Sequence, residues 1–261
     1  MKKTAALILC MAILLSAVSC QKGPDEPAVS AGTVTAAPPA ESTTATQTTE
    51  PPETEPPIVV EIPKETRDDV MSKLRYYADG APDLYGWIII SGTDIDYPLV
   101  QSEDNDYYLD HSEFKEWREI GSLFVDYRNR KNVEHDYNYN IVMYGHNLTW
   151  GGMFHDVQTM FENEQMFRDA YIYIYTFDGI YVYEPFAIYE ANAYYQYFRT
   201  HFDAPEEFVD FANEMKGNSI YAEDVEFDGD DRMITLSTCT NTYVDGRYAL
   251  QAKLVQVTRW E

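Results

Sequence analysis

Cysteine is scarce in this sequence: its 261 residues include three, Cys10, Cys20 and Cys239. The first two lie in an N-terminal stretch with the pattern of a targeting signal, so Cys239 is the single thiol of the remaining chain. One cysteine excludes an internal disulfide framework and argues against a structural zinc site. An isolated thiol is either a buried small hydrophobic group or a reactive one. The polar sequence around Cys239 favours a reactive group.

Positive charge is also scarce, with 19 Lys and Arg against 44 Asp and Glu and a net charge of −25. Nucleic-acid binding requires basic surface, so the composition predicts no nucleic-acid partner. The acidic run from 223 to 231 lacks the spacing of a calcium-binding loop, and the neighbours Asp110 and His111, or His155 and Asp156, lack metal-ligand spacing. We therefore predict no metal and no cofactor.

No apolar run reaches the roughly 20 residues that a membrane-spanning helix needs. The run from Ala5 to Val18 follows the basic Met1-Lys2-Lys3 and ends at Ser19-Cys20, which predicts a signal peptide over residues 1–20. Residues 17–20 resemble a lipobox, in which Cys20 would carry the lipid, and an uncleaved signal anchor is the alternative. Either hypothesis predicts a chain outside the cytoplasm, tethered to the outer face of the cell membrane.

Large apolar side chains are nearly absent from the next segment, which is dominated by Pro, Thr, Ala, Glu and Ser. Such a segment cannot bury enough surface to offset its chain entropy, so residues 21–60 are predicted to be a disordered linker. Globular composition begins at about residue 58, and we place a single folded domain at 61–261.

Two helices are predicted in this domain. Apolar residues at helical spacing indicate one from Thr66, the expected N-cap, to Ala78, and another from Pro205 to Lys216, ended by Gly217. Strand-like stretches are expected at 86–90, 95–100, 122–126, 140–144, 171–177, 180–189, 219–221, 233–239 and 247–258. Many short strands with few helices predict a mainly β fold, a barrel rather than an alternating α/β sheet.

The stretch Met233–Cys239 carries the strongest chemical signal. Period-2 alternation places Ile234 and Leu236 on a core face and leaves Cys239 at the C-terminal end of the strand. An Asp-Gly turn signal at 245–246 precedes a second strand that begins at Arg247. If the two strands pair as a hairpin about 4.8 Å apart, the thiol and the guanidinium share one sheet rim.

Among five histidines, at 111, 135, 146, 155 and 201, His146 differs from the others in its position. It follows the buried-looking strand 140–144 and a glycine, so it also lies at a strand end. His146 and Cys239 are 93 residues apart, as expected of a site assembled on a rigid scaffold.

These motifs strongly resemble those of sortases. The matching stretches are Tyr144-Gly145-His146-Asn147, Thr235-Leu236-Ser237-Thr238-Cys239 with Arg247 eight positions later, Gly86-Trp87-Ile88, 95–101 and 105–109. The similarity covers roughly residues 65–261, and the stretches 105–109, 121–126 and 205–216 are most like class B sortases.

The resemblance implies an eight-stranded sortase β-barrel with an N-terminal helix and an inserted helix near 205–216. It implies a cysteine transpeptidase that cleaves a sorting signal of secreted proteins through a thioester and transfers them to an amine of the peptidoglycan cross-bridge or of a pilin. Cys239 would be the nucleophile, His146 the general acid/base and Arg247 the oxyanion-binding group. The lipobox-like Cys20 departs from the spanning anchor that is common in the family.

Residues beside these three form a predicted substrate-binding set: Asn147, Ser237, Thr238 and Thr240. The backbone N–H of Thr240 would help to bind the oxyanion, whereas Ser237 and Thr238 would hydrogen-bond the sheet and loops, and Asn147 would orient the His146 ring or turn the chain. Two other functions stay open: a thiol hydrolase that uses water as acceptor, and a non-catalytic surface lipoprotein that binds peptide or haem.

Overall fold

The computed structural model describes residues 59–129, 138–240 and 242–260. The predicted signal peptide, the lipidation site at Cys20 and nearly all of the predicted linker lie outside the described residues, as does His135. No helix within the described ranges combines the length and apolar character needed to cross a bilayer.

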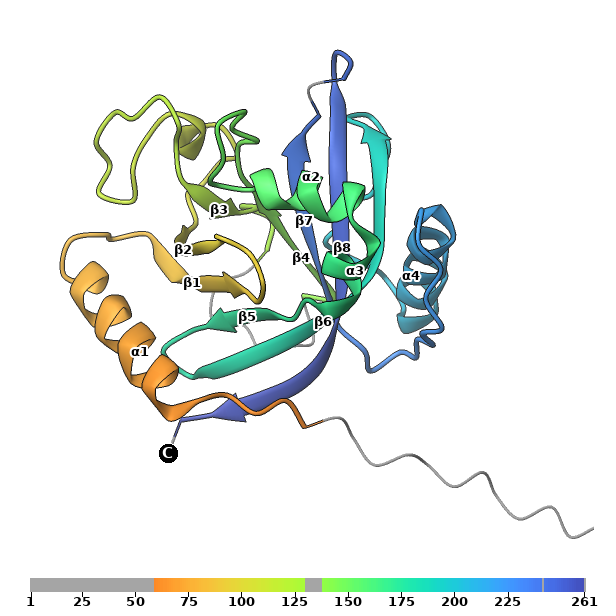
Figure 1. Ribbon diagram of the computed structural model, residues 1–261, viewed down its shortest axis with the longest axis horizontal. Coiled ribbons are helices and arrows are strands. Elements are labelled where there is room, and N and C mark those ends of the chain that lie inside the picture. The colour runs from red at the N-terminus through yellow and green to blue at the C-terminus, as the bar shows by residue number, and fades with distance from the viewer. Residues whose placement is uncertain (1–58, 130–137, 241, 261) are drawn as a thin grey trace, which may run out of the picture. The chain divides into compact units, whose positions relative to one another are not determined.

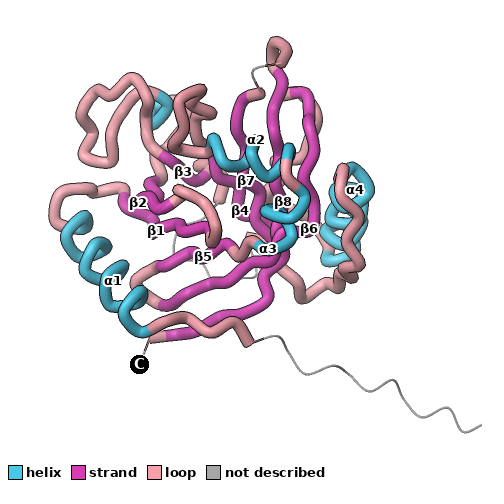
Figure 2. The backbone as a smooth tube through the Cα atoms, viewed as in Figure 1, coloured by secondary structure: helices cyan, strands magenta, loops and turns pink. Residues whose placement is uncertain are grey.

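Eight strands of the described chain close into a barrel, in the order β1-β2-β3-β4-β7-β8-β6-β5 (Figures 1 and 2). Their bounds are β1 Leu84–Ile90, β2 Asp96–Val100, β3 Leu123–Val125, β4 Asn140–Tyr144, β5 Ile172–Tyr175, β6 Gly179–Asn192, β7 Met233–Cys239 and β8 Gly246–Arg259. The β2–β3 and β4–β7 pairs are parallel and the others antiparallel. The predicted mainly β, eight-stranded barrel is confirmed.

One predicted strand, 219–221, is wrong. Ser219 is the C-terminal cap of a helix, and the backbone N–H of Ile220 donates a single hydrogen bond to the carbonyl of Ile188 on β6, at 3.0 Å. The Ser219 hydroxyl meanwhile accepts the Ile188 N–H at 3.1 Å. This short contact fastens the chain to the sheet without extending it.

Both predicted helices are present, with different ends. Helix α1, Lys64–Ala78, begins one turn early with Pro63 as its N-cap and no side-chain cap, so the capping role predicted for Thr66 is wrong. Helix α4, Pro205–Asn218, continues through Gly217 rather than stopping there. Its buried side chains are those that the spacing predicts: Phe208, Phe211, Ala212 and Met215. Figure 2 shows α1 and α4 outside the ring of strands.

Three short elements were not predicted: α2 His155–Glu162, α3 Glu164–Asp169 and a 3-10 helix, η1, Tyr107–Leu109. The two α-helices have eight and six residues, too few for a sustained helical period. They form because Val157, Met160 and Phe167 pack into the barrel core. Tertiary contact rather than local propensity therefore specifies them.

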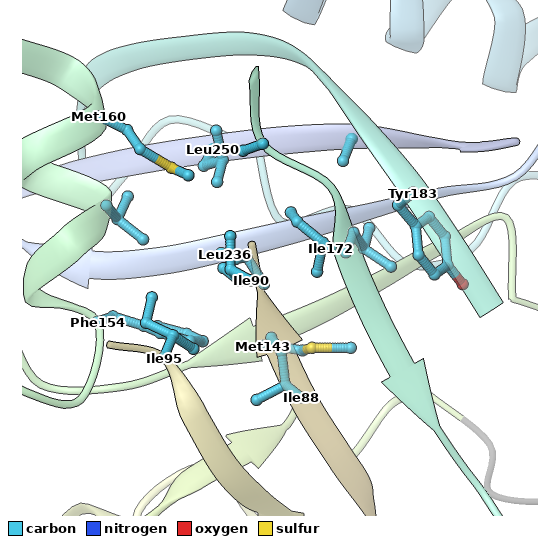
Figure 3. Close-up of a cluster of buried hydrophobic side chains, with 14 of the residues drawn as sticks. Ile88, Ile90, Ile95, Met143, Phe154, Met160, Ile172, Tyr183, Leu236 and Leu250 are labelled. Carbon is cyan, nitrogen blue, oxygen red and sulfur yellow. The ribbon is translucent and has the colours of Figure 1, made fainter. Parts of the chain in front are cut away.

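The barrel interior is a continuous hydrophobic cluster (Figure 3). Ile234 and Leu236 of β7 are fully buried in it, beside Leu250 of β8 and Met143 of β4. The opposite face of β7 is polar but also buried: Thr235 donates a hydrogen bond to the side-chain oxygen of Asn140 at 2.9 Å. The predicted alternation is confirmed, and burial on both faces fixes the position of β7.

Truncating the core side chain of β7 should destabilise the barrel. We expect Leu236→Ala to lower the free energy of unfolding by about 3 kcal/mol, because it removes a fully buried side chain and leaves a cavity. Urea denaturation measures the change. Val257→Ala on β8, where the side chain is 40% exposed, is the matched control and should cost less than about 1 kcal/mol. Equal losses in the two variants would contradict the assignment of the core.

Candidate active site

Cys239 and Arg247 lie directly across from each other where β7 and β8 meet the loop that joins them. They are paired residues of this antiparallel ladder, as the sequence predicts. Cys239 is exposed and Arg247 is half-buried. The carbonyl of Gly246 accepts the backbone N–H of Thr240 at 3.0 Å and the Nη1 donor of Arg247 at 2.8 Å. One carbonyl thus holds the hairpin closed and positions the guanidinium beside the thiol-bearing strand end.

His146 reaches the same rim from the other side of β7. Strand β4 runs parallel to β7 with Tyr144 opposite Ser237. The register continues beyond the strand, because the Gly145 N–H donates to the Ser237 carbonyl at 3.3 Å and the Thr238 hydroxyl donates to the Gly145 carbonyl at 2.7 Å. His146 therefore follows Gly145 at the level where Cys239 follows Thr238, on strands that pair about 4.8 Å apart.

The half-buried ring of His146 forms a hydrogen bond of 2.8 Å between Nε2 and the carbonyl oxygen of Leu109. A carbonyl oxygen only accepts, so Nε2 carries the hydrogen. In the neutral ring this leaves Nδ1 as the nitrogen that can accept a proton. Leu109 lies in η1, an element that the sequence analysis did not predict.

Asn147 links the histidine segment to the end of β7. Its amide nitrogen donates to the carbonyl of Cys239 at 3.0 Å and to the side-chain oxygen of Gln158 at 2.7 Å. Its amide oxygen lies 2.9 Å from Nδ1 of His155. The side chain thus ties the backbone beside His146 to the backbone of Cys239. His155 and Gln158, both on α2, were not predicted to belong to the site.

The three hydroxyl residues near the thiol have partners within the protein. Ser237, which is buried, shares a hydrogen bond of 2.8 Å with the hydroxyl of Tyr197, and Thr240 shares one with the hydroxyl of Thr242. Thr238 bonds Gly145, as described above. These contacts agree with sheet and loop roles, and direct contact of Ser237, Thr238, Thr240 or Asn147 with a substrate stays a prediction. The backbone N–H of Thr240 donates to the carbonyl of Gly246. It is therefore already engaged and is not available for the hydrogen bond to an oxyanion that the sequence analysis predicted.

Tyr197 is a further polar group beside the site, and the sequence analysis did not single it out. Burial raises the pKa of its phenol, while the Ser237 hydrogen bond and the positive charge of Arg247 lower it. The net pKa shift is upward, so the phenol stays protonated, and either hydroxyl can donate in its hydrogen bond with Ser237. Its hydrogen bond to Ser237, two residues before Cys239 on β7, joins it to the strand that carries the thiol.

The buried carboxylate of Asp126 is hydrogen-bonded to β4, the strand that leads to His146. It accepts hydrogen bonds from Nη2 of Arg128 at 2.6 Å, the Tyr144 hydroxyl at 2.8 Å and the Asn105 amide at 3.0 Å. Burial raises the pKa of Asp126, but hydrogen bonds from Arg128 and Tyr144 outweigh it and hold the pKa below its usual value. The charged carboxylate joins β4 to the segment that leads into η1.

No group of three or more His, Cys, Asp or Glu side chains in the described ranges is arranged to hold a metal ion. His111 instead pairs with Asp110, with 2.6 Å between Nδ1 and the carboxylate oxygen, and His201 lies 3.5 Å from Asp203. His155 bonds Asn147 rather than its sequence neighbour Asp156.

Comparison with known proteins gives one consistent family. A sortase domain model matches residues 88–255. Sortase B of Listeria monocytogenes is 38% identical over 194 residues, covering 72% of this chain and 76% of the relative, and sortase B of Staphylococcus aureus is 32% identical over 179 residues, covering 67% and 72%.

Solved structures agree with the sequence relatives. A crystal structure of Clostridium perfringens sortase B superposes with a TM-score of 0.65 at 33% identity, over 70% of this chain and 99% of that one. A Staphylococcus aureus sortase B–substrate complex gives 0.66 at 29% identity, over 74% and 89%.

The Asp126 cluster should make stability depend on pH. Because the folded-state pKa lies below the unfolded value, this stability is fully present above the unfolded pKa and is lost as pH falls through the folded one. We expect Asp126→Asn to lower the free energy of unfolding at neutral pH by on the order of 2 kcal/mol, because it removes the charge of a buried carboxylate that accepts hydrogen bonds from Arg128 and Tyr144. Urea denaturation at a series of pH values should show the difference from wild type shrinking toward acid.

The matched control for this experiment is Glu164→Gln, which removes an exposed pair with Arg168 four residues along α3. It should cost less than about 1 kcal/mol at any pH. A difference between wild type and Asp126→Asn that stays constant from neutral to acid pH would contradict the ionised state assigned to Asp126.

Proposed function

This chain belongs to the sortase family, as a class B cysteine transpeptidase, and from that premise we propose that it cleaves the C-terminal sorting signal of secreted proteins through a thioester and transfers them to an amine of the cell wall or of a pilin. The observation that carries the proposal is the cross-strand pair of Cys239 and Arg247, with His146 at the end of the parallel neighbour strand. An exposed thiol beside a permanent positive charge is the arrangement that favours a thiolate nucleophile.

In the first half-reaction, the thiolate of Cys239 attacks the carbonyl carbon of the threonine in the sorting signal. The tetrahedral intermediate that forms carries its charge on the former carbonyl oxygen. As the carbon–nitrogen bond breaks, His146 gives its proton to the departing amine, and the enzyme retains the peptide as a thioester.

In the second half-reaction, an amine from a peptidoglycan cross-bridge or another protein attacks the thioester carbon. His146 now takes the proton of the incoming amine, and the carbon–sulfur bond breaks as the new amide forms. Cys239 leaves as a thiolate and His146 is again protonated, so both groups return to their starting states.

Arg247 is the oxyanion-binding group of this proposal. Its guanidinium is always charged and presents donors in a planar fork, of which Nη1 is used by Gly246. The remaining donors suit the developing oxyanion or a substrate carbonyl. Because the N–H of Thr240 is engaged in the hairpin, the proposal assigns oxyanion binding to Arg247 alone.

The N-terminal segment supports a proposal about location. The basic start, the apolar run from Ala5 to Val18 and the lipobox-like ending at Cys20 favour export and tethering to the outer face of the cell membrane, by lipid or by signal anchor. The Pro- and Thr-rich segment up to residue 60 would then act as a spacer that lets the catalytic domain reach substrates away from the bilayer.

Removing the thiol should abolish the reaction. We expect Cys239→Ala to form no acyl-enzyme with any peptide of a sorting-signal panel, because the described part of the chain contains no second thiol to hold the acyl chain. Mass spectrometry of protein and products, with and without an added amine, measures both steps. Cys20→Ala is the matched thiol control and should transfer normally in solution. Cleavage by Cys239→Ala would refute the assignment, and release of acid at equal rates with and without amine would favour a thiol hydrolase.

Replacing the guanidinium with an ammonium should impair chemistry although charge is kept. We expect Arg247→Lys to lower kcat by on the order of 100-fold, the usual loss when an oxyanion donor is removed. Arg259→Lys, at the far end of the same strand, is the control and should retain activity. The measurement is the rate of transpeptidation at saturating peptide. A fully active Arg247→Lys protein would contradict the oxyanion role.

A further inference from the structure

The hydrogen bond that orients the His146 ring comes from the backbone. No carboxylate in the described part of the chain forms an ion pair with His146, and Nε2 donates instead to the carbonyl oxygen of Leu109 at 2.8 Å. We propose that this carbonyl is the positioning group of the catalytic histidine. It holds the ring in the Nε2–H form and leaves Nδ1 as the nitrogen that exchanges protons. The proposal rests on the acid/base role proposed for His146.

The turn that contains Leu109 is built so that this one carbonyl is available. The carbonyl of Tyr108 accepts the N–H of Ser122, that of Asp110 accepts the N–H of Arg118, and that of His111 accepts the Ser122 hydroxyl, each at 2.9 Å. Segment 118–122 thus engages the carbonyls on either side of Leu109. The Leu109 carbonyl between them is left for the imidazole.

Side chains hold the same turn in place. Tyr108 is fully buried, and its hydroxyl donates to Asp83 at 2.9 Å. The rings of Tyr107 and His111 stack with centroids 4.2 Å apart, and Nδ1 of His111 lies 2.9 Å from the Tyr107 carbonyl. A turn fixed at both ends and along its length can hold a neighbouring side chain in one orientation.

Gly121 is what allows the turn and segment 118–122 to lie so close. Its φ is +56°, a conformation that favours glycine. A Cβ at this position would overlap the carbonyl oxygen of Tyr108 and lie 2.5 Å from that of Leu109. Any side chain at 121 must therefore force apart segment 118–122 and the turn that carries the Leu109 carbonyl, the acceptor for His146.

A neutral acceptor suits a histidine that must both give and take a proton. A carbonyl accepts the Nε2 hydrogen of the imidazole and of the imidazolium alike, so the ring keeps its orientation through the catalytic cycle. It also adds no negative charge that would compete with the thiolate of Cys239 for the protonated ring. Proton exchange is confined to Nδ1.

Gly121→Ala tests the proposal, with Gly92→Ala as the matched control. Gly92 also has a positive φ, +74°, but a Cβ there meets nothing within 4 Å. Activity and the tautomer of His146 are measured on the same full-length proteins, the latter from imidazole ¹⁵N chemical shifts assigned by comparison with His146→Gln. We expect Gly121→Ala to lose the Nε2–H tautomer preference and to lower kcat on the order of 100-fold, as displaced catalytic groups do. Gly92→Ala should match wild type in both measurements.

Loss of activity in Gly121→Ala with an unchanged tautomer would overturn the proposal, because the effect would then be structural. If that variant does not fold, a second one carries the test. Replacing Asp110 by its α-hydroxy acid makes the Leu109 carbonyl an ester, a weaker acceptor, and the same replacement at Glu103 is its control. The Asp110 ester should shift the His146 tautomer and lower kcat, whereas unchanged values would refute the positioning role.

The tautomer measurement separates this proposal from the proposed function. If the wild-type protein transfers peptides normally, but the His146 tautomer is the same in wild type, in Gly121→Ala and in the Asp110 ester, only the positioning role is refuted. A protein whose tautomer responds as expected, but which acylates no sorting peptide, would refute the transpeptidase assignment and with it the catalytic meaning of the contact.

Discussion

The register of β7 against its two neighbours determines the site. Its antiparallel pairing with β8 sets Arg247 opposite Cys239, and its parallel pairing with β4 brings His146 to the same level. A slip of one residue on either side would turn the reactive group to the opposite face of the sheet. Burial on both faces opposes such slips, because Leu236 fills the barrel core and Thr235 and Ser237 have specific hydrogen-bond partners on the other face.

Around this strand, polar contacts hold the rim in one arrangement. The Asn147 side chain joins the segment after β4 to the carbonyl of Cys239, and the Gly246 carbonyl accepts a hydrogen bond from Arg247. The Asp126 carboxylate accepts one from Tyr144 on β4. Each contact ends on a backbone group or a buried charge, which leaves little freedom for relaxation. Groups at the ends of these strands are thus held in place by the closed barrel, while the thiol itself stays exposed.

The sequence predicts much of this because its signals are local. Period-2 alternation and the Asp-Gly turn place Cys239 opposite Arg247, and strand 140–144 leads to His146. The partners of these residues are not predictable in the same way. Leu109, Tyr197 and His155 meet the site through tertiary contacts, and no residue pattern marks a backbone carbonyl as an acceptor.

The wrong predictions have similar causes. Helices α2 and α3 are too short to show a period and form by packing on the core. The cap assigned to Thr66 failed because the helix already begins after Pro63, whose fixed φ suits a helix start. The apparent strand at 219–221 has strand-like composition, but its hydrogen bonds to β6 all go to one residue, Ile188.

The closing strand of the barrel has a consequence for how the protein is made. Arg247 is carried by β8, which pairs with β6 along its length and with β7 over residues 247–253, and which is the last strand of the described chain. A polypeptide that has emerged only as far as β7 therefore has a thiol without its guanidinium. The β7–β8 hairpin is local in sequence, whereas the β6–β8 and β4–β7 pairings join distant segments and carry a larger loop-closure cost in folding. The thiol, the guanidinium and the imidazole therefore share one rim only once β8 and the parallel β4–β7 pair are both in place.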